Sequence, residues 1–333
     1  MATTVNAAFT EFMTDYVRLD NGRNEVAKKS KTNLIEQVNK FPNDGKFPRY
    51  YDTVSIEYGS YSRRTKIRPL DDIDMMFILH AEGGQLNSRF DGSFDITLPP
   101  NVPSNLSGLC FDNSFILNSR KVINKFIEYL GNLTDYEKAD IKRNQEAATL
   151  KLKSYEWVYD IVPSFITNKE TLGEYFMIPD GNGHWKKTDP RIDKERTINI
   201  NSKQKVSVLD IVRIMKYWTA RPTMPTMSSY LLENIILNYY DTNESSTVYI
   251  DMELPNIFAL IYNQIHQRIN DPKGFQGDIN TLNWNDRNSI QQRAELDYNR
   301  AVEARKFENE GNHKSSISKW SEIFGPNFPP HTA

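Results

Sequence analysis

One short run does most to limit the folds open to this chain: residues 71–79, Asp-Asp-Ile-Asp-Met-Met-Phe-Ile-Leu. After Asp74 the run is continuously apolar, which is typical of a strand buried on both faces. Just before it, Val54, Ile56 and Tyr58 alternate with polar residues, and this period of two predicts another strand. The two segments together predict a sheet in which residues 71–79 form a central strand.

The rest of the chain divides into a mixed half and an all-helical half. An irregular insertion is expected at 81–113, and a hairpin is expected in 145–166. Expected helices follow the apolar periodicity and lie at 6–41 (two helices), 116–131, 208–219, 230–240, 254–268, 286–310 and 315–324. The fold class is therefore α+β, and the expected domains are 1–205, with the N-terminal helices, and 206–333.

Composition excludes several classes of protein. The 333 residues carry 41 Lys and Arg against 43 Asp and Glu, a net charge of −2, which does not favour binding to long nucleic acid. A single cysteine, Cys110, excludes an internal disulfide framework and a cysteine-based metal cage. No apolar run approaches the roughly 18–20 residues of a membrane span. The N-terminal segment lacks the pattern of a secretory signal. We therefore expect a cytoplasmic protein without a membrane partner.

Three carboxylates stand out in the mixed half. Strand side chains alternate between faces, so Asp72 and Asp74 project to the same side, about 6.5 Å apart along the strand. Asp160 lies in the second expected strand of the 145–166 hairpin. Magnesium prefers oxygen ligands, and it usually takes one or two carboxylates plus substrate phosphates. If the strand of Asp160 is a neighbour, the three carboxylates would complete a two-metal site for an in-line displacement.

Other residues suit a phosphate-bearing substrate. Gly59 permits a close backbone approach, and its amide together with Ser60 could hold phosphates. Lys216 offers a compact positive charge in an expected helix, while Ser229 and Tyr230 open the next one, where amide dipoles favour anions. Each feature alone is also compatible with a structural role, since Asp-x-Asp motifs, Gly-Ser turns, solvated lysines and core tyrosines are common.

The order of these residues resembles a known superfamily. Gly59-Ser60, eleven intervening residues, Asp72-Ile-Asp74 and then Asp160-Ile-Val-Pro-Ser resembles the polymerase-β-like nucleotidyltransferases. Within that superfamily the chain is similar to the bacterial, SMODS-type CD-NTases, relatives of cyclic GMP–AMP synthase and oligoadenylate synthetase. The helical half agrees through Ile-Met-Lys-Tyr-Trp at 214–218, Ser-Tyr-Leu-Leu-Glu at 229–233 and the C-terminal pattern around Trp320. The resemblance covers about residues 30–328.

The resemblance implies a nucleotidyltransferase core with a C-terminal helical lobe like that of oligoadenylate synthetase, and an active site in the cleft between them. It implies ATP or GTP as substrates, two Mg²⁺ ions (or Mn²⁺), and a cyclic di- or trinucleotide second messenger. Such products serve anti-phage defence of the CBASS type, by activating a downstream effector. By motif, Asp72 and Asp74 would ligate both metals, and Asp160 would ligate the catalytic metal and orient or deprotonate the attacking ribose hydroxyl. The donor nucleotide would be held by Gly59, Ser60, Lys216, Ser229 and Tyr230, with Tyr230 stacked on the base.

The sequence also bears on base choice, on regulation and on alternative functions. Ser164 occupies the position that faces the base in this family, and its small size favours purines. The chain has no Cys/His zinc ribbon like that of the animal enzymes, which favours control by partners or metabolites instead of DNA. The tail after Gly325 looks flexible, and it could be frayed or coupled to another protein through its C-terminus. An RNA-end transferase of the CCA-adding or polyadenylating kind, and an inactive nucleotide-binding module, remain alternatives.

Overall fold

The computed structural model describes residues 2–100, 103–243 and 245–332. Its contacts divide the chain into two compact units, each made of several segments. The helical unit comprises Met1–Asn21, Arg63–Pro69 and Ile192–Ala333, and the sheet unit comprises Gly22–Ser62 and Leu70–Arg191. The chain thus divides differently from the expected boundary at 205/206, because the N-terminal helix and the basic loop after Ser62 pack with the C-terminal helices.

The sheet unit combines a nine-stranded mixed sheet with helices, and the fold is α+β as expected. Its strands are β1 (Tyr50–Glu57), β2 (Asp72–Leu79), β3 (Gln85–Ser88), β4 (Phe94–Thr97), β5 (Asp140–Asn144), β6 (Ala147–Lys151), β7 (Val158–Ile166), β8 (Phe176–Pro179) and β9 (Trp185–Thr188). Its helical segments are α2 (Asn21–Val38), η2 (Phe41–Asp44), α3 (Gly59–Ser62), η3 (Ser107–Leu109), α4 (Ser119–Gly131), η4 (Thr134–Tyr136) and α5 (Lys169–Leu172).

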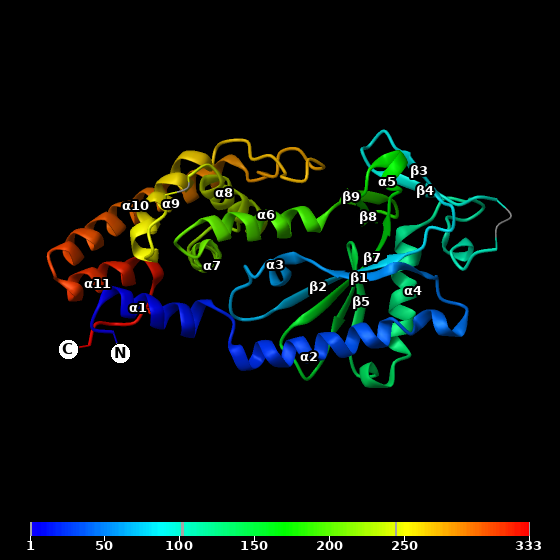
Figure 1. Cartoon of the computed structure of the whole chain (residues 1–333), viewed down its shortest axis with the longest axis horizontal. Coiled ribbons are helices and arrows are strands. Elements are labelled where there is room, and N and C mark those ends of the chain that lie inside the picture. Colours follow the sequence, from blue (N-terminus) through cyan, green and yellow to red (C-terminus); the bar gives the residue numbers. More distant parts are fainter. Residues whose placement is uncertain (1, 101–102, 244, 333) are drawn as a thin grey trace. The chain divides into compact units, whose positions relative to one another are not determined.

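The strand order β1-β2-β7-β8-β9-β4-β3 makes β2 an interior strand, as its apolar run predicts (Figure 1). β2 and β7 are parallel, while the other pairs are antiparallel. The first half of β7 pairs with β6, and its last residues pair with β8. Every residue of β2 after Asp74 is buried, which confirms the prediction of burial on both faces.

The two faces of β2 have different neighbours. Ile73, Met75 and Phe77 point to the face that helix α4 covers, where the rings of Phe77 and Phe126 lie 6.1 Å apart. Met76 and Ile78 lie on the other face and form a small apolar cluster with Phe176 of β8. Since alternate residues share a face, Asp72 and Asp74 belong to this second face.

Some segments differ from the sequence-based expectation. The insertion at 81–113 contains the β3–β4 hairpin, which joins the sheet where Phe94 pairs with Trp185; residues 101–102 lie outside the described part. The expected helix at 116–131 begins only at Ser119. Strand β5 was not expected, because its residues are mostly exposed and lack an apolar alternation.

The helical unit contains α1 (Val5–Phe12), the π-helical turn η1 (Met13–Val17), α6 (Pro190–Lys203), α7 (Val208–Thr219), α8 (Ser229–Thr242), α9 (Ile250–Gln264), α10 (Trp284–Asn309) and α11 (His313–Phe324). Its core joins the first and last helices, since Phe9 of α1 packs edge-on against Trp320 of α11 at 5.0 Å. Helix α6 was not expected, because it is largely polar and has little periodicity.

The C-terminal tail is ordered through residue 332, which corrects the expectation of a flexible end. Ala2 and His331 form a parallel β-bridge, and the amide of Thr332 donates to the carbonyl of Ala2 at 3.0 Å. Phe328 is buried against Phe9 and Phe12 of α1. Both ends of the chain therefore lie side by side in the helical unit (Figure 1).

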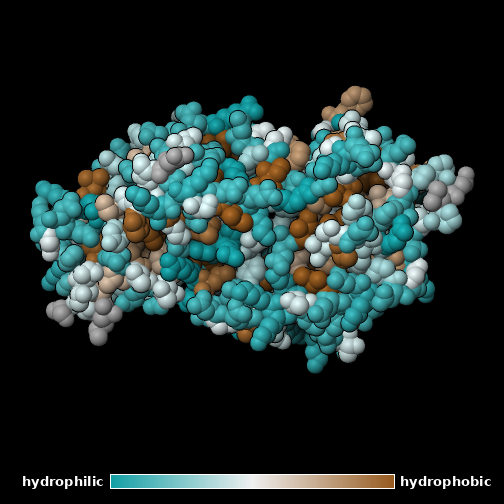
Figure 2. Space-filling model, in the orientation of Figure 1, coloured by the Kyte–Doolittle hydropathy of each residue, from teal (hydrophilic) through white to brown (hydrophobic). Residues whose placement is uncertain are grey.

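The surface is largely polar, in agreement with the many charged residues of the sequence. The face seen in Figure 2 is mainly hydrophilic, with scattered apolar residues. Among the residues that the structure describes, no helix has the length and apolar character that crossing a membrane requires.

Candidate active site

The register of two parallel strands brings the predicted carboxylates together. Asp74 of β2 lies directly opposite Asp160 of β7, and Asp72 lies opposite Val158. Neighbouring strands are about 4.8 Å apart, and cross-strand partners share a face. Asp72, Asp74 and Asp160 therefore project from one face of the sheet, next to the apolar cluster of Met76 and Ile78.

Gly59 sits against one of these carboxylates. It has a positive φ of 70° and begins the single-turn helix α3, so the expected Gly-Ser turn is a short helix that contains Ser60. A β-carbon added to Gly59 would lie 1.7 Å from Oδ2 of Asp74, far inside van der Waals contact. Only glycine satisfies both the backbone conformation and the close approach. The motif thus places backbone amides beside the carboxylate face.

Tyr58 precedes Gly59 and lies beside Asp74, and it was not predicted as part of the site. Its amide donates to the carbonyl of Asp74 at 3.4 Å, and its ring packs on the Met76 cluster. Burial raises the pKa of the Tyr58 phenol well above its ordinary value, and the nearby charges of Asp74 and Asp160 raise it further. The phenol therefore stays protonated near neutral pH. Its position at the end of an alternating segment was the available signal, but the sequence did not show that Asp74 and Asp160 lie close to it.

The donor chemistry of this face suits a hard cation. In the described part of the chain, no group of three or more His, Cys, Asp and Glu side chains is arranged to hold a metal ion by itself. Magnesium does not require such a cage, because it commonly binds one or two carboxylates and completes its shell with substrate phosphates and water. Asp72, Asp74 and Asp160 supply carboxylate oxygens only, which are the ligands that magnesium prefers. The residues present therefore fit magnesium when a phosphate-bearing substrate shares it.

Lys216 lies in the helical unit and is buried, with partners of its own. Its ammonium contacts the Glu233 carboxylate and donates to the carbonyl of Thr65 at 3.0 Å. Arg63 donates to the same Glu233 at 3.0 Å. Burial lowers the pKa of Lys216, and the Glu233 charge only partly opposes this. Glu233 is 1% exposed and lies within the Ser-Tyr-Leu-Leu-Glu segment, but it was not among the predicted site residues.

Glu233 is held ionised by its two cations. Burial acts to raise its pKa, but the charges of Arg63 and Lys216 outweigh burial and keep the pKa below its ordinary value. The two cations also fix the 63–69 loop on helices α7 and α8. Arg63 is therefore an internal ion-pair partner and not part of a solvated loop.

Tyr230 and Ser229 open helix α8 of the same unit. Ser229 is exposed, whereas Tyr230 is half-buried, with its hydroxyl bonded to Asp193 at 2.8 Å and to Asp271 at 3.1 Å. The ammonium of Lys273 lies 4.2 Å from the centre of the Tyr230 ring. These contacts fix the orientation of the ring, which is the property that a stacking platform for a base requires.

Comparison with known proteins decides the family. The chain is 40% identical over 336 residues to a probable cyclic nucleotide synthase of Bacillus cereus strain VD146, and the match covers 99% of both chains. The chain belongs to the cyclic nucleotide synthases, the CD-NTase family. It is a nucleotidyltransferase, as the sequence motifs predict. No family model matches the chain.

Solved structures agree with this assignment at the level of the fold. The structure of Escherichia coli MS115-1 CdnC with ATP matches with a TM-score of 0.70 at 15% identity, and covers 97% of this chain and 98% of that one. The complex of the same CdnC with HORMA-deltaN matches with a TM-score of 0.67, also at 15% identity and with the same coverage. The synthase therefore has the CD-NTase fold.

Ser164 of the synthase lies on the carboxylate face but is fully enclosed. It sits opposite Ile78 in the parallel register, and its hydroxyl donates to the carbonyl of Phe77 at 3.2 Å. Its exposed fraction is 0%. Ser164 was predicted to face a base; its hydroxyl bonds to the backbone of β2 and so serves the packing of β2 against β7.

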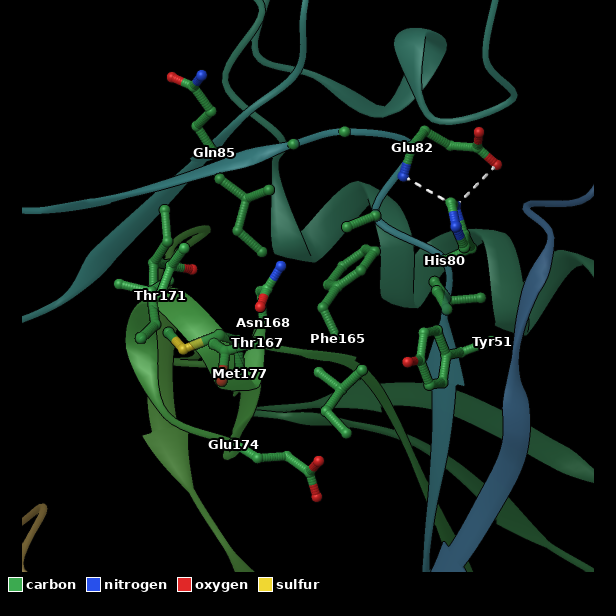
Figure 3. A pocket seen from close by; sticks show the side chains of 18 of the residues that line it. Tyr51, His80, Glu82, Gln85, Phe165, Thr167, Asn168, Thr171, Glu174 and Met177 are labelled. Carbon is green, nitrogen blue, oxygen red and sulfur yellow. Dashed lines mark hydrogen bonds and ion pairs between the residues drawn. The ribbon is translucent and has the colours of Figure 1, made fainter.

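A separate hollow lies at the other end of the same strands. It measures about 820 Å³ and is lined by residues just after β2 and β7, among them His80 and Thr167, and by the β3–β4 hairpin. In Figure 3, Phe165 and Met177 point into it, and His80 bonds to Glu82 at its edge. Asp72, Asp74 and Asp160 are not among its lining residues. The hollow is therefore distinct from the carboxylate face of the synthase.

Proposed function

We propose that this synthase condenses nucleoside triphosphates into a cyclic di- or trinucleotide in a magnesium-dependent reaction. The observation that carries the proposal is the direct opposition of Asp74 and Asp160, with Gly59 packed on Asp74. A nucleotidyl transfer needs negative ligands for cations beside backbone donors for phosphates, and this face offers both. In the cell, the product would act in the cytoplasm as a messenger of anti-phage (CBASS-type) defence, through a downstream effector.

The three carboxylates have distinct proposed roles. Asp72 and Asp74, which share a strand and a face, would hold two magnesium ions. Asp160 would hold the catalytic ion and orient the attacking ribose hydroxyl, or accept its proton. When bound, the ions stabilise the charge that develops on the transferred phosphoryl group. The chain itself contributes fixed strands, so that the carboxylates need little reorganisation during the reaction.

Other residues would bind and orient the donor nucleotide. The amides of Gly59 and Ser60 and the Ser60 hydroxyl would hold its phosphates, with added contacts from Lys216 and Ser229. The ring of Tyr230, held by Asp193 and Asp271, would stack on its base. The ammonium of Lys216 must exchange at least one present partner to contact a phosphate, so this residue would bind at an energetic cost.

ATP is the first substrate to test, since the CdnC structure that shares the fold was determined with ATP. We propose a preference for purines, ATP and GTP, over pyrimidines. The enclosed position of Ser164 offers this preference no direct contact with a base, so competition among the four nucleotides is its proper test.

A protein regulator is a further proposed partner. The same CdnC is known in a complex with a HORMA protein, and this supports asking whether the synthase is also controlled by a bound protein. Coupling of the C-terminus to another protein would have to accommodate the pairing of Ala2 with His331.

The product decides between the proposed function and its alternatives. The synthase is incubated with magnesium and labelled nucleotides, with or without RNA, and then treated with phosphatase. Phosphatase-resistant label that forms without RNA, and that disappears in the Asp72→Ala, Asp74→Ala double variant, supports the proposal. Label that requires added RNA would support an RNA-end transferase. Absence of label in every mixture, unchanged in the double variant, would indicate an inactive binding module.

A further inference from the structure

We infer that Thr149 is a positioning residue that holds the Asp160 carboxylate in its working orientation; this rests on the proposed function. Thr149 of β6 lies directly opposite Asp160 in the antiparallel β6–β7 register. Its hydroxyl donates to Oδ1 of Asp160 at 2.8 Å. No role was predicted for this threonine, since the exact register of β6 against β7 is visible only in the folded sheet.

The position of the Thr149 hydroxyl is tightly restricted. Its side chain lies on the same face as Asp160, and the residue is only 8% exposed. A β-branched side chain in a strand has few rotamers, so its hydroxyl is nearly fixed once the strand is fixed. Its neighbours Ala148 and Leu150 are fully buried on the opposite face, which ties this part of β6 to the core.

The contact belongs to a row that crosses three strands. Thr149, Asp160 and Asp74 occupy matching positions on β6, β7 and β2. Adjacent carboxylates repel one another, and in the absence of a cation this repulsion pushes the Asp160 carboxylate away from Asp74, toward Thr149. The Thr149 hydroxyl holds Oδ1 on that side and restricts the carboxylate to one orientation, because the hydrogen bond is lost when the carboxylate turns. Thr149 thus keeps Asp160 ready for a cation and for the ribose hydroxyl.

The expected loss of activity can be judged from other metal sites, where hydrogen bonds orient the side chains that ligate the metal. Removing a residue that orients a ligand typically costs about 10–100-fold in metal affinity or activity. Thr149→Val removes the hydroxyl and keeps both the shape and the strand preference of the side chain. We therefore expect about a tenfold or greater loss of turnover, with the nucleotide KM changed by less than about threefold.

The experiment compares four proteins: the wild type, Thr149→Val, Thr149→Ser and Thr53→Val. Thr149→Ser keeps the hydroxyl, and Thr53→Val makes the same exchange at an exposed position of β1. Each is assayed for kcat, KM and thermal midpoint. Binding of Mn²⁺ in the presence of a non-hydrolysable ATP analogue is measured by electron paramagnetic resonance, which does not depend on turnover.

The inference requires a specific pattern. Thr149→Val should lose turnover and bind Mn²⁺ about tenfold more weakly, with an unchanged thermal midpoint, while Thr149→Ser and Thr53→Val stay within about threefold of wild type. Wild-type turnover and Mn²⁺ affinity in Thr149→Val would overturn it. Equal losses in the Val and Ser variants, together with a lower thermal midpoint, would also overturn it, by showing a packing role. A wild type that makes no product would instead refute the proposed function, and Mn²⁺ binding by the same proteins would still decide the role of Thr149.

Discussion

The α-carbon of Gly59 faces the carboxylate of Asp74 so closely that there is no room for a β-carbon between them. This relationship joins two parts of the motif that are separated by a loop belonging to the other unit.

Gly59→Ala should reduce activity by about two orders of magnitude. The added methyl would lie 1.7 Å from Oδ2 of Asp74 and must displace that carboxylate, and the positive φ adds strain. Initial rates measure the effect. Gly131→Ala is a matched control, because no atom lies within 4 Å of its added β-carbon and its φ is not positive. Activity of Gly59→Ala within about threefold of wild type would contradict the close packing.

Asp74→Asn should abolish turnover and leave the fold intact. The amide keeps the shape of the side chain but cannot supply the charge that a cation and the transition state require. Product formation and circular dichroism measure the two effects. The matched control is Asp52→Asn, at an exposed position of β1, which should behave as wild type. Near-normal activity in the Asp74 variant would show that the active site lies elsewhere.

Two exchanges at Tyr230 separate stacking from hydrogen bonding. Tyr230→Phe and Tyr230→Leu both lose the hydroxyl that bonds to Asp193 and Asp271, but only the leucine lacks an aromatic face. Stacking on a base contributes about 1–3 kcal/mol, so the KM for ATP should be about tenfold higher in the Leu variant than in the Phe variant. Equal KM values would mean that the ring does not contact a base.

Lys216→Met should weaken nucleotide binding and also destabilise the helical unit. It removes one of the two cations of the buried Glu233; because Arg63 still pairs with that carboxylate, the cost should stay below the roughly 3–5 kcal/mol of leaving a buried charge unpaired. Urea denaturation and the KM for ATP measure the two effects. The Lys216→Met, Glu233→Gln double variant also leaves Arg63 without its carboxylate partner, so it should be less stable than the single variant and share its raised KM. If the single variant is as stable as wild type, the pair contributes nothing to the fold.

Acid should destabilise the protein partly through Glu233. Its folded pKa is held below the ordinary 4.5, so it contributes stability above that pH, and the contribution is lost as pH falls through the depressed folded value. Unfolding free energies at a series of pH values from 7 to 3.5 measure this loss. The Glu233→Gln variant is less stable at neutral pH but should show a shallower decline below pH 4.5. Parallel curves for the two proteins would contradict the assignment.

Local patterns predicted strands β1, β2, β6 and β7 but not the other strands of the sheet. The apolar run after Asp74 fixed an interior strand, and alternation correctly put Asp72 and Asp74 on one face, since both properties depend only on neighbouring residues. The parallel pairing of β2 with β7 was beyond such reasoning. Nearly eighty residues separate the two strands, and only the folded sheet shows that Asp74 meets Asp160 and not another residue of β7.

The partners of buried charged residues could not be predicted from the sequence. A lysine in an amphipathic helix has the same sequence pattern whether it faces solvent, a phosphate or an internal carboxylate. Lys216 therefore could not be assigned to Glu233 until α7 and α8 were packed together. Similarly, nothing local in the first helix shows that Phe9 packs on Trp320, so the N-terminal helix was assigned to the first expected domain and not to the helical one.

The bridge between Ala2 and His331 makes the backbone almost a closed ring. In such a ring the position of the chain break matters little to the packing, and new termini can be opened at an exposed turn once the old ones are linked. The β3–β4 turn at Asp91-Gly92, exposed and remote from the carboxylates in the sheet order, is a natural place for that opening. Because Ala2 and His331 are neighbours, a tag added at one end would lie next to the other end. Fusion partners for this synthase are therefore better inserted at the Asp91-Gly92 turn than added at an end.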